Sequence, residues 1–450
     1  MARARYAAAM SAGPLPAWPR ALRMVTAVVV IAVASGLFAI GFREALFRTV
    51  TAVSGEDGVV AAFTAAPWWL RLLAPIVGGL AAGTIVRFAV RGPGGVGAVM
   101  EAVALGRVRL SLRATLARAG ATWCAIVSGG SIGREAPLIQ VGGALGKVVG
   151  RQFALDVTGQ RIAIAAGCAA GFTAAYNTPL AAILFVLEIV IGVFVIDAVV
   201  PIALATVIAT VITRATGGAG PLYGQRAFAM ASPVELLAFV GVGVAAALAG
   251  MAFVAAFHAV ARALARIPQP WRAALGGAGV GAILIGVPAV AGNGFEPLAD
   301  VLDERLAVAT IAVLMIAKLA ATAASVGSGS PGGVFTPILL LGGGAGALVA
   351  AGLAHLGAGP LAPAGGYALV GMAAATAATT HAPLMAAVLA FELSGDYAIA
   401  LPLLVATATA TALARVIDKR SLYTAELPAP HAWELTLDVR RGAEDLDRSG

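Results

Sequence analysis

The apolar positions of the chain fall into long runs separated by short polar stretches. Seven runs are apolar for about the 20 residues that a helix needs to cross the hydrocarbon core of a bilayer. They cover residues 24–46, 69–90, 198–214, 233–262, 271–292, 305–325 and 398–417. Apolar residues do not alternate with polar ones inside these runs, which disfavours a membrane β-barrel. The pattern therefore predicts an all-α polytopic membrane protein.

Shorter apolar pieces, interrupted by glycine and proline, lie between the long runs. They cover residues 113–130, 136–150, 161–173, 178–195, 335–354, 366–380 and 383–394. We expect that these pieces do not all cross the membrane as straight helices. Non-helical backbone at membrane depth is stable only where protein buries it or a cavity hydrates it. The pattern thus predicts broken helices gathered around an internal cavity.

The composition and charge agree with a membrane location. Hydrophobic residues make up 60% of the chain and charged residues only 12%, far fewer than in a soluble protein of 450 residues. We interpret the net charge of +8 as a positive-inside bias rather than as a sign of nucleic-acid binding. Basic residues mark residues 1–23, which hold four arginines and no acid, and the tail, with Arg415, Lys419, Arg420, Arg440, Arg441 and Arg448. Both termini are therefore predicted to be cytoplasmic, and the alanine-rich composition indicates a bacterial inner membrane.

Residue types that bind metals or form disulfides are sparse. Cys124 and Cys168 are the only cysteines and both lie in apolar segments, so neither a disulfide nor a cysteine metal site is indicated. The four histidines are scattered without the spacing of metal ligands. We predict no metal site.

The interrupted pieces repeat along the chain. Residues 128–146 align with 328–346 at an offset of 200, and residues 167–188 align with 371–392 at an offset of 204. Two alignments at nearly the same offset indicate duplicated halves, with a membrane repeat at 24–217 and another at 218–423 between the cytoplasmic segments 1–23 and 424–450. Transporters are commonly built from such halves, with the substrate site where the halves meet.

Each repeated piece places a proline near the start of an apolar run, at Pro137, Pro179, Pro337 and Pro383. Proline is tolerated in the first turn of a helix, so helices are expected to begin at these positions. A helix N-terminus carries partial positive charge and free N–H donors, which attract anions. Several such ends meeting inside the membrane would form an anion site. Glu135 stands at one of them, so its carboxylate is predicted to compete with the permeant anion and act as a gate.

Several motifs resemble those of the CLC family of chloride channels and chloride/proton antiporters. GREAP at 133–137 resembles the family signature GREGP, GSGSPGGVFTP at 327–337 resembles its GxFxP region, and SLYTA at 421–425 resembles the segment with its pore tyrosine. The segments 177–188 and 381–392 match two further family helices. The resemblance implies a homodimer in which each subunit has its own pore, built from two inverted halves.

The resemblance also implies roles for individual residues. Glu135 matches the gating glutamate, and Gly133 and Arg134 of the same motif are expected to contribute to anion binding. Val334 and Phe335 match residues whose backbone amides contact the central anion. Tyr423 matches the tyrosine whose hydroxyl closes the inner side. Two plainer interpretations stay open, because Phe335 could be a packing aromatic and Tyr423 a tyrosine of the membrane interface.

The chain departs from the family pattern in the segment RGPGGVGAVMEA at 91–102. Depending on the alignment, Pro93 or Gly94 stands where the family has its selectivity serine, and neither supplies a hydroxyl. In the family, proline at this position accompanies a preference for nitrate. The anion-binding prediction therefore includes Pro93 and Gly94, and it leaves chloride and nitrate open. Ala136 in place of the glycine after the glutamate is a milder departure.

A second departure concerns proton coupling. Exchangers of the family commonly have an internal glutamate directly after the residue matched by Glu188, and here that position is Ile189. This favours a passive channel over an exchanger, although some exchangers also lack the glutamate. Glu188 itself could be a stop on a proton path or a structural residue. Lys318, inside the run 305–325, could add positive potential near the inner mouth or extend to the membrane interface.

We therefore predict a voltage- or pH-gated channel for small inorganic anions in the lipid bilayer, with chloride or another small anion as its only bound group. A proton-coupled antiporter is the alternative. A distant alternative is an intramembrane enzyme with Ser328 or Ser330 as nucleophile. Such a serine needs a base within reach, and His355 and His381, the nearest candidates, are in no recognisable setting. The prediction is a protein that is not an enzyme.

Overall fold

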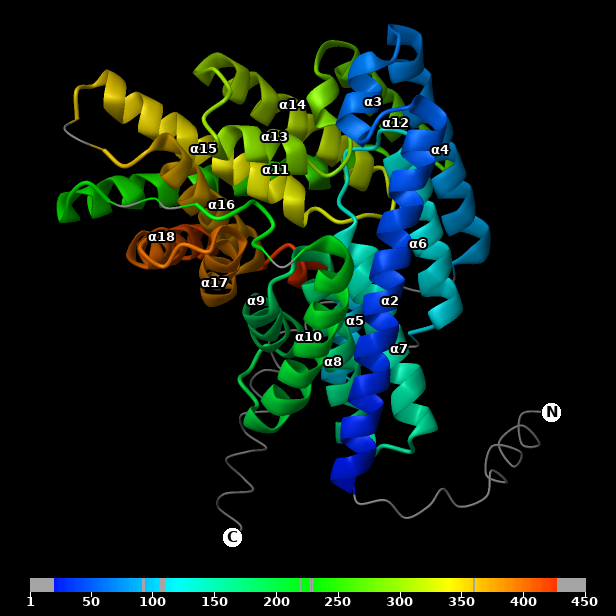
Figure 1. Ribbon diagram of the computed structural model, residues 1–450. Coiled ribbons are helices and arrows are strands. Elements are labelled where there is room, and N and C mark those ends of the chain that lie inside the picture. The colour runs from blue at the N-terminus through cyan, green and yellow to red at the C-terminus, as the bar shows by residue number, and fades with distance from the viewer. Residues whose placement is uncertain are drawn as a thin grey trace.

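The computed structural model describes residues 20–90, 94–105, 110–218, 220–226, 228, 230–358 and 361–426. Their regular structure is helical, apart from one isolated β-bridge between Gly133 and Gly333. In Figure 1, α2, α4 and α6 run nearly upright, while α11 and α18 of the second half run nearly horizontally. The first half contains α2 (Arg20–Ser54), α3 (Val59–Ala65), α4 (Trp68–Ala89), α5 (Gly95–Leu105), α6 (Leu112–Val127), α7 (Glu135–Gln152), α8 (Val157–Tyr176), α9 (Pro179–Leu184), a π-helical turn (Phe185–Ile191) and α10 (Ile196–Gly217).

The second half follows with a matching order of helices. It contains α11 (Leu236–Ala263), α12 (Gln269–Gly286), α13 (Phe295–Leu302), α14 (Val308–Gly327), α15 (Phe335–His355), α16 (Ala364–Thr380), α17 (Pro383–Ser394) and α18 (Ala400–Ile417). Asn177 and His381 end α8 and α16 in the left-handed conformation, with φ of 58° and 59°. Each is followed by a helix that begins at a proline, Pro179 or Pro383. The duplication is therefore repeated in the backbone, and the predicted fold class of broken helices in two halves is confirmed.

Two predictions about the membrane spans are wrong. The run 271–292 is not one continuous helix, because α12 ends at Gly286 and a 3-10 turn follows from Pro288 to Val290, where proline cannot continue the helix ladder. The piece 335–354, expected to be interrupted, is the continuous 21-residue helix α15 and is long and apolar enough to span. The other six predicted runs coincide with helices of that kind.

Glycines inside the shorter helices bring neighbouring backbones together instead of breaking them. The helices α7 and α8 are continuous over 18 and 20 residues. A Cβ atom on Gly142 of α7 would lie 2.0 Å from the carbonyl oxygen of Gly167 on α8, a distance that no real side chain could occupy. Small residues permit this close helix packing in membrane proteins. The sequence pattern was thus correct about glycine enrichment, but wrong to treat these glycines as interruptions.

Reciprocal carboxylate caps join the two halves. Glu392 on α17 accepts hydrogen bonds from the backbone amides of Leu180 (2.9 Å) and Ala181 (2.7 Å), at the start of α9. In the same way, Glu188 accepts from the amides of Leu384 (3.4 Å) and Met385 (2.8 Å), at the start of α17. A carboxylate is stabilised at a helix N-terminus because it pairs with free N–H groups and with the helix dipole. Each half therefore holds a helix start of the other.

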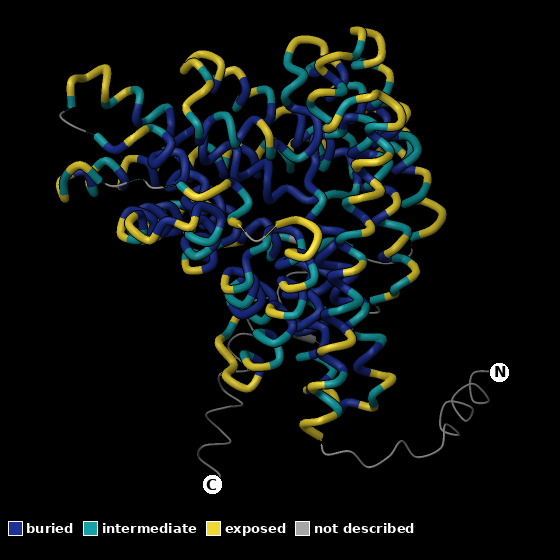
Figure 2. Tube along the Cα trace, in the orientation of Figure 1, coloured by how far each residue is buried: buried dark blue, intermediate teal, exposed yellow. Residues whose placement is uncertain are grey.

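The most deeply buried helices lie at the centre of the molecule. Figure 2 shows buried backbone through the middle and exposed segments along the outer helices. Almost every residue of α16 is buried, as are most residues of α7, α8 and α15. Outer helices such as α2 and α10 instead expose large apolar side chains, including Leu37 and Val200, as expected for surfaces that face lipid. The starts of α7 and α15 are thus placed inside the protein.

Candidate anion site between the two halves

The loops that precede α7 and α15 face each other through their glycines. Gly133 donates its amide to the carbonyl of Gly333 at 2.6 Å, and Gly333 donates to Gly133 at 2.8 Å. The pairing is antiparallel. These two glycines are the residues that coincide in the repeat alignment at an offset of 200. The bridge therefore brings the N-termini of α7 and α15 together at the predicted meeting point of the halves.

Glu135, the first residue of α7, occupies the space between these helix starts. Its side chain is only 3% exposed, and its Oε1 accepts a hydrogen bond from the backbone amide of Phe335 at 2.8 Å. Its Oε2 has no hydrogen-bond partner among the described residues. The carboxylate thus sits on a free N–H group at the start of α15, a position that favours negative charge.

The paired glycines leave room for this carboxylate. A Cβ on Gly133 would lie 2.0 Å from Oε2 of Glu135, and a Cβ on Gly333 would lie 2.1 Å from Oε1. Any side chain at either position would have to displace the carboxylate. The geometry explains why glycine stands at both positions, and it places Gly333, one of the glycines that the sequence pattern suggested for a close approach to a ligand, beside the Glu135 carboxylate.

A small cavity, called here the inner cavity, lies on one side of Glu135. It has a volume of about 60 Å³, and its lining includes Gly95, Val96, Glu135, Val334 and Tyr423. Tyr423 is buried and follows Leu422, whose amide donates to Thr379 at 2.9 Å and so fixes this segment against α16. Three residues that the resemblance selected, Glu135, Val334 and Tyr423, therefore line one cavity although they lie far apart in the sequence.

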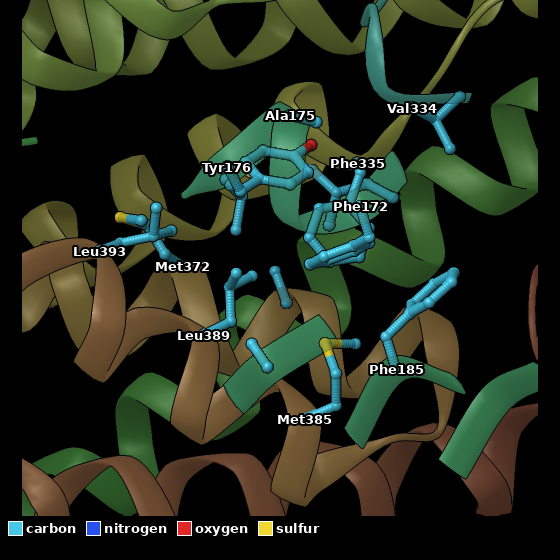
Figure 3. Close-up of a cluster of buried hydrophobic side chains, with 14 of the residues drawn as sticks. Phe172, Ala175, Tyr176, Phe185, Val334, Phe335, Met372, Met385, Leu389 and Leu393 are labelled. Carbon is cyan, nitrogen blue, oxygen red and sulfur yellow. The ribbon is translucent and has the colours of Figure 1, made fainter. Parts of the chain in front are cut away.

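Phe335 serves two purposes at once. Its amide binds Glu135, while its ring packs edge-on against Phe172 with the ring centroids 5.5 Å apart. Figure 3 shows the ring beside those of Phe172 and Tyr176, with Val334 standing apart from this cluster. The Tyr176 hydroxyl is 3.0 Å from that of Thr336, the next residue of α15. The plainer interpretation of Phe335 as a packing aromatic is thus correct for its side chain, while its backbone amide points to the Glu135 carboxylate.

A second space, called here the gate cavity, lies on the other side of Glu135. It is narrow, about 10 Å³, and its lining includes Arg134, Glu135, Tyr223 and Asn293. Arg134 lines this space and not the inner cavity. The two adjacent charged residues of the GREAP motif therefore have different positions. Glu135 lies between the two cavities, while Arg134 lines only the gate cavity of the two, on the side away from Tyr423.

The segment that departs from the family pattern is partly visible. Pro93 lies outside the described residues. Gly94 immediately precedes α5, and the guanidinium of Arg118 packs directly against it, so that a Cβ on Gly94 would lie 2.0 Å from Nη1. Gly95 and Val96 of the same segment line the inner cavity. Arg118 was missed in the sequence, where the signal was a charged residue inside an otherwise apolar piece.

Of the two alternatives left open for Lys318, the one in which its side chain extends to the membrane interface is wrong. Its side chain is fully buried, and Nζ donates to the carbonyls of Val290 at 3.0 Å and Gly292 at 2.8 Å. This loop leads directly to Asn293 of the gate cavity. A buried amine without such partners would be costly, so the loop carbonyls explain why the lysine lies inside.

The distant enzyme hypothesis gains nothing from the geometry. Ser328 donates its hydroxyl to the carbonyl of Ser325 at 2.8 Å, as residues at the end of a helix commonly do. Ser330 donates its backbone amide to the carbonyl of Ser325 at 3.2 Å, and within the described part of the chain neither serine is hydrogen-bonded to a histidine. A serine without a base in reach is a weak nucleophile.

Comparison with known proteins decides the family. A family model described as "Voltage gated chloride channel" matches residues 77–415. The chain belongs to the CLC family. A ClcB-like chloride channel protein of Ralstonia nicotianae is 40% identical over 415 residues, which cover 90% of this chain and 96% of the relative. A voltage-gated ClC-type chloride channel, ClcB, of Escherichia coli O81 is 31% identical over 415 residues, or 89% of this chain and 98% of the relative.

Solved structures confirm the CLC fold. A slow cyanobacterial Cl⁻/H⁺ antiporter superposes with a TM-score of 0.78 at 23% identity, covering 90% of this chain and 96% of the other. A CLC-type fluoride/proton antiporter superposes with a TM-score of 0.73 at 22% identity, covering 89% and 96%. At these identities the likeness concerns the fold. The chain is an integral membrane protein of the CLC family, and its anion-site residues stay predictions.

Proposed function

We propose that this CLC protein carries small inorganic anions through a pathway that Glu135 closes. The observation that carries the proposal is the carboxylate bound to the amide of Phe335, between the inner cavity and the gate cavity. A group that binds one carboxylate oxygen through a helix N-terminus can also bind a halide or nitrate. Family membership, over residues 77–415, supports the same conclusion.

The gate works by competition for one site. When Glu135 is ionised it holds the Phe335 amide and fills the space between the cavities. When it is protonated or displaced, the amide becomes available to an anion arriving from either side. Partial charges at helix ends bind an ion without a full opposing charge, and so they release it again, as conduction requires. Val334 and Tyr423 line the inner side of the same space.

Passive conduction and proton-coupled exchange are the two mechanistic forms of this proposal. Ile189, where exchangers commonly have a second glutamate, favours a channel. The two solved structures described above are antiporters of 23% and 22% identity, which keeps exchange as the alternative. Glu188, the remaining candidate for a proton path, caps the start of α17, and this position supports a structural role for it.

The reversal potential of reconstituted protein under a pH gradient distinguishes the two forms. A channel gives a reversal potential that follows the anion gradient alone, while an antiporter gives one that shifts with the pH gradient. Glu188→Gln should leave either behaviour unchanged if the residue is only a cap. Loss of a pH-dependent shift in that variant, with thermal stability preserved, would assign Glu188 to a proton path.

The Glu135→Ala variant tests the gate itself. Because alanine cannot reach the Phe335 amide, we expect anion flux to persist and any proton coupling to disappear. Flux lost in a variant that is still folded would contradict the assignment of Glu135 as a gate. Fluxes of chloride, nitrate and fluoride through the wild type would determine which anion the segment around Pro93 and Gly94 prefers.

We further propose a homodimer in the inner membrane of a bacterium, with both termini cytoplasmic. The family resemblance supports the dimer, the bacterial relatives support the location, and the basic residues at both ends support the orientation. The mass of the protein in detergent micelles tests the dimer. Protease accessibility of the tail in inside-out vesicles tests the orientation.

A further inference from the structure

Two larger cavities open beyond the gate cavity, and they differ in charge. The first, the arginine cavity, has a volume of about 120 Å³ and is lined by residues that include Arg43, Arg134, Asn177 and Leu222. Among the described residues, the charged ones that line this cavity are the two arginines. The second, the acidic cavity, has a volume of about 340 Å³. It shares both arginines with the first cavity but also has three carboxylates, at Glu44, Asp57 and Glu296.

Both arginines keep their charge available to the arginine cavity. Within the described residues, neither Arg43 nor Arg134 lies within ion-pairing distance of a carboxylate. Arg43 donates from Nη2 to the hydroxyl of Thr216 at 3.1 Å, which holds its guanidinium at the end of α10. Arg134 is fixed by its backbone position directly before α7. Two unpaired guanidinium groups thus border one cavity.

The arginine cavity borders the gate cavity, which in turn borders Glu135. Arg134, Ala175 and Leu222 line both the arginine cavity and the gate cavity. Glu135 then separates the gate cavity from the inner cavity. The lining residues therefore form a continuous series from Arg43 to Tyr423, with the fixed positive charge at one end and the carboxylate in the middle.

The position of Arg43 places this end of the series at the outer face. Arg43 lies 23 residues after Arg20 on α2, which corresponds to about 35 Å along a helix. That distance matches the thickness of the hydrocarbon core, about 30 Å. If the N-terminal segment is cytoplasmic, as proposed above, Arg43 lies near the external surface.

We propose that the arginine cavity is a second binding site for small inorganic anions, where an external anion is held before it displaces Glu135. This inference rests on the proposed function of the Glu135 pathway. A cleft lined by one sign of charge raises the local concentration of the opposite ion. The acidic cavity also borders the gate cavity, through Arg134 and Asn293, but its three carboxylates oppose the same arginines there. The arginine cavity is therefore the more favourable approach to Glu135 for an anion.

Neutralising Arg43 tests the site against a matched control. Chloride flux is measured in proteoliposomes at a fixed low chloride concentration, while impermeant isethionate salts vary the ionic strength. Arg43→Gln should lower inward flux about threefold at an ionic strength near 0.01 M, where charges act over about 30 Å, and should have little effect near 1 M, where they act over about 3 Å. Arg48→Gln removes the same charge from the same helix, at a side chain that is 78% exposed and paired with Glu44. Because Arg48 lines neither cavity, this variant should lower the flux clearly less than Arg43→Gln does.

Charge reversal on folded protein provides a second test. The Arg43→Cys variant is assembled first and then modified with a cationic or an anionic thiosulfonate reagent. Treated wild type controls for Cys124 and Cys168. The cationic adduct should restore flux at low ionic strength, and the anionic adduct should depress it below that of the unmodified variant.

The outcomes separate this inference from the proposed function. Wild type without anion flux would overturn the proposed function. Normal wild-type flux, together with an Arg43→Gln loss that is equal at low and high ionic strength, would show that Arg43 only holds the end of α10 and would overturn the second site. Adducts of opposite charge with equal flux would overturn it as well.

Discussion

Replacing Glu135 by glutamine changes the charge of the gate and almost nothing of its shape. The glutamine oxygen can still accept from the Phe335 amide, which lies 2.8 Å from Oε1 in the native site. The bond is then neutral, and the interaction between a full negative charge and the start of α15 is lost. Glu135→Gln therefore isolates the electrostatic part of the closed state.

The expected size of the effect follows from this single bond. A hydrogen bond to a charged group contributes about 1.5–3 kcal/mol, and a neutral one about 0.5–1.5 kcal/mol. The second carboxylate oxygen has no partner among the described residues, so it adds no further hydrogen bond. The closed state should lose about 1–2 kcal/mol, which corresponds to about a 5- to 30-fold rise in the open population.

Chloride efflux from proteoliposomes at two pH values measures this change. In the wild type, protonation of Glu135 removes the charge that holds the gate shut, so flux should rise as the pH falls. In Glu135→Gln the flux at neutral pH should already be high and should not depend on pH. A folded Glu135→Gln protein whose flux still rises with acid as steeply as the wild type would refute the reasoning, because another group would then be titrating.

Three further changes test the surroundings of the site. Glu392→Gln weakens the cap of α9 and should lower stability by about 1–2 kcal/mol, seen as a lower unfolding temperature with unchanged anion selectivity; altered selectivity at full stability would speak against a cap. Gly94→Ala places a methyl group on the Arg118 guanidinium and should change the chloride-to-nitrate permeability ratio, whereas an unchanged ratio would remove this segment from the anion site. The hydrogen bond from Arg226 holds the pKa of Asp303 below its ordinary value. The stability from this pair is therefore complete above about pH 4 and is lost as the pH falls further, so Asp303→Asn should flatten the fall of the unfolding temperature in acid, and an unaltered fall would contradict the pairing.

The sequence was informative where local chemistry decides the structure. Prolines marked helix starts, and Pro179 and Pro383 are the first residues of α9 and α17. Glu135 was placed at a helix N-terminus from the residues around it, and it is the first residue of α7. Such features depend on neighbours along the chain, which a sequence displays directly.

Features that depend on distant contacts were not predictable in the same way. The glycines of α15 looked like interruptions, because the sequence does not show that α16 packs against them closely enough to need them. For Lys318 the sequence left a place near the inner mouth and one at the membrane interface open, because its partners, the carbonyls of Val290 and Gly292, belong to another segment. The contribution of Arg43 to the arginine cavity likewise arises only when α2 packs beside α10.

The central claim is that Glu135 and the permeant anion compete for the same place at the start of α15. Anomalous diffraction from crystals in bromide, comparing wild type with Glu135→Ala, tests this most directly. The account predicts a bromide peak within hydrogen-bonding distance of the Phe335 amide in the variant, at the position that the carboxylate fills in the wild type. A variant that binds bromide elsewhere but leaves the space between α7 and α15 empty would contradict it.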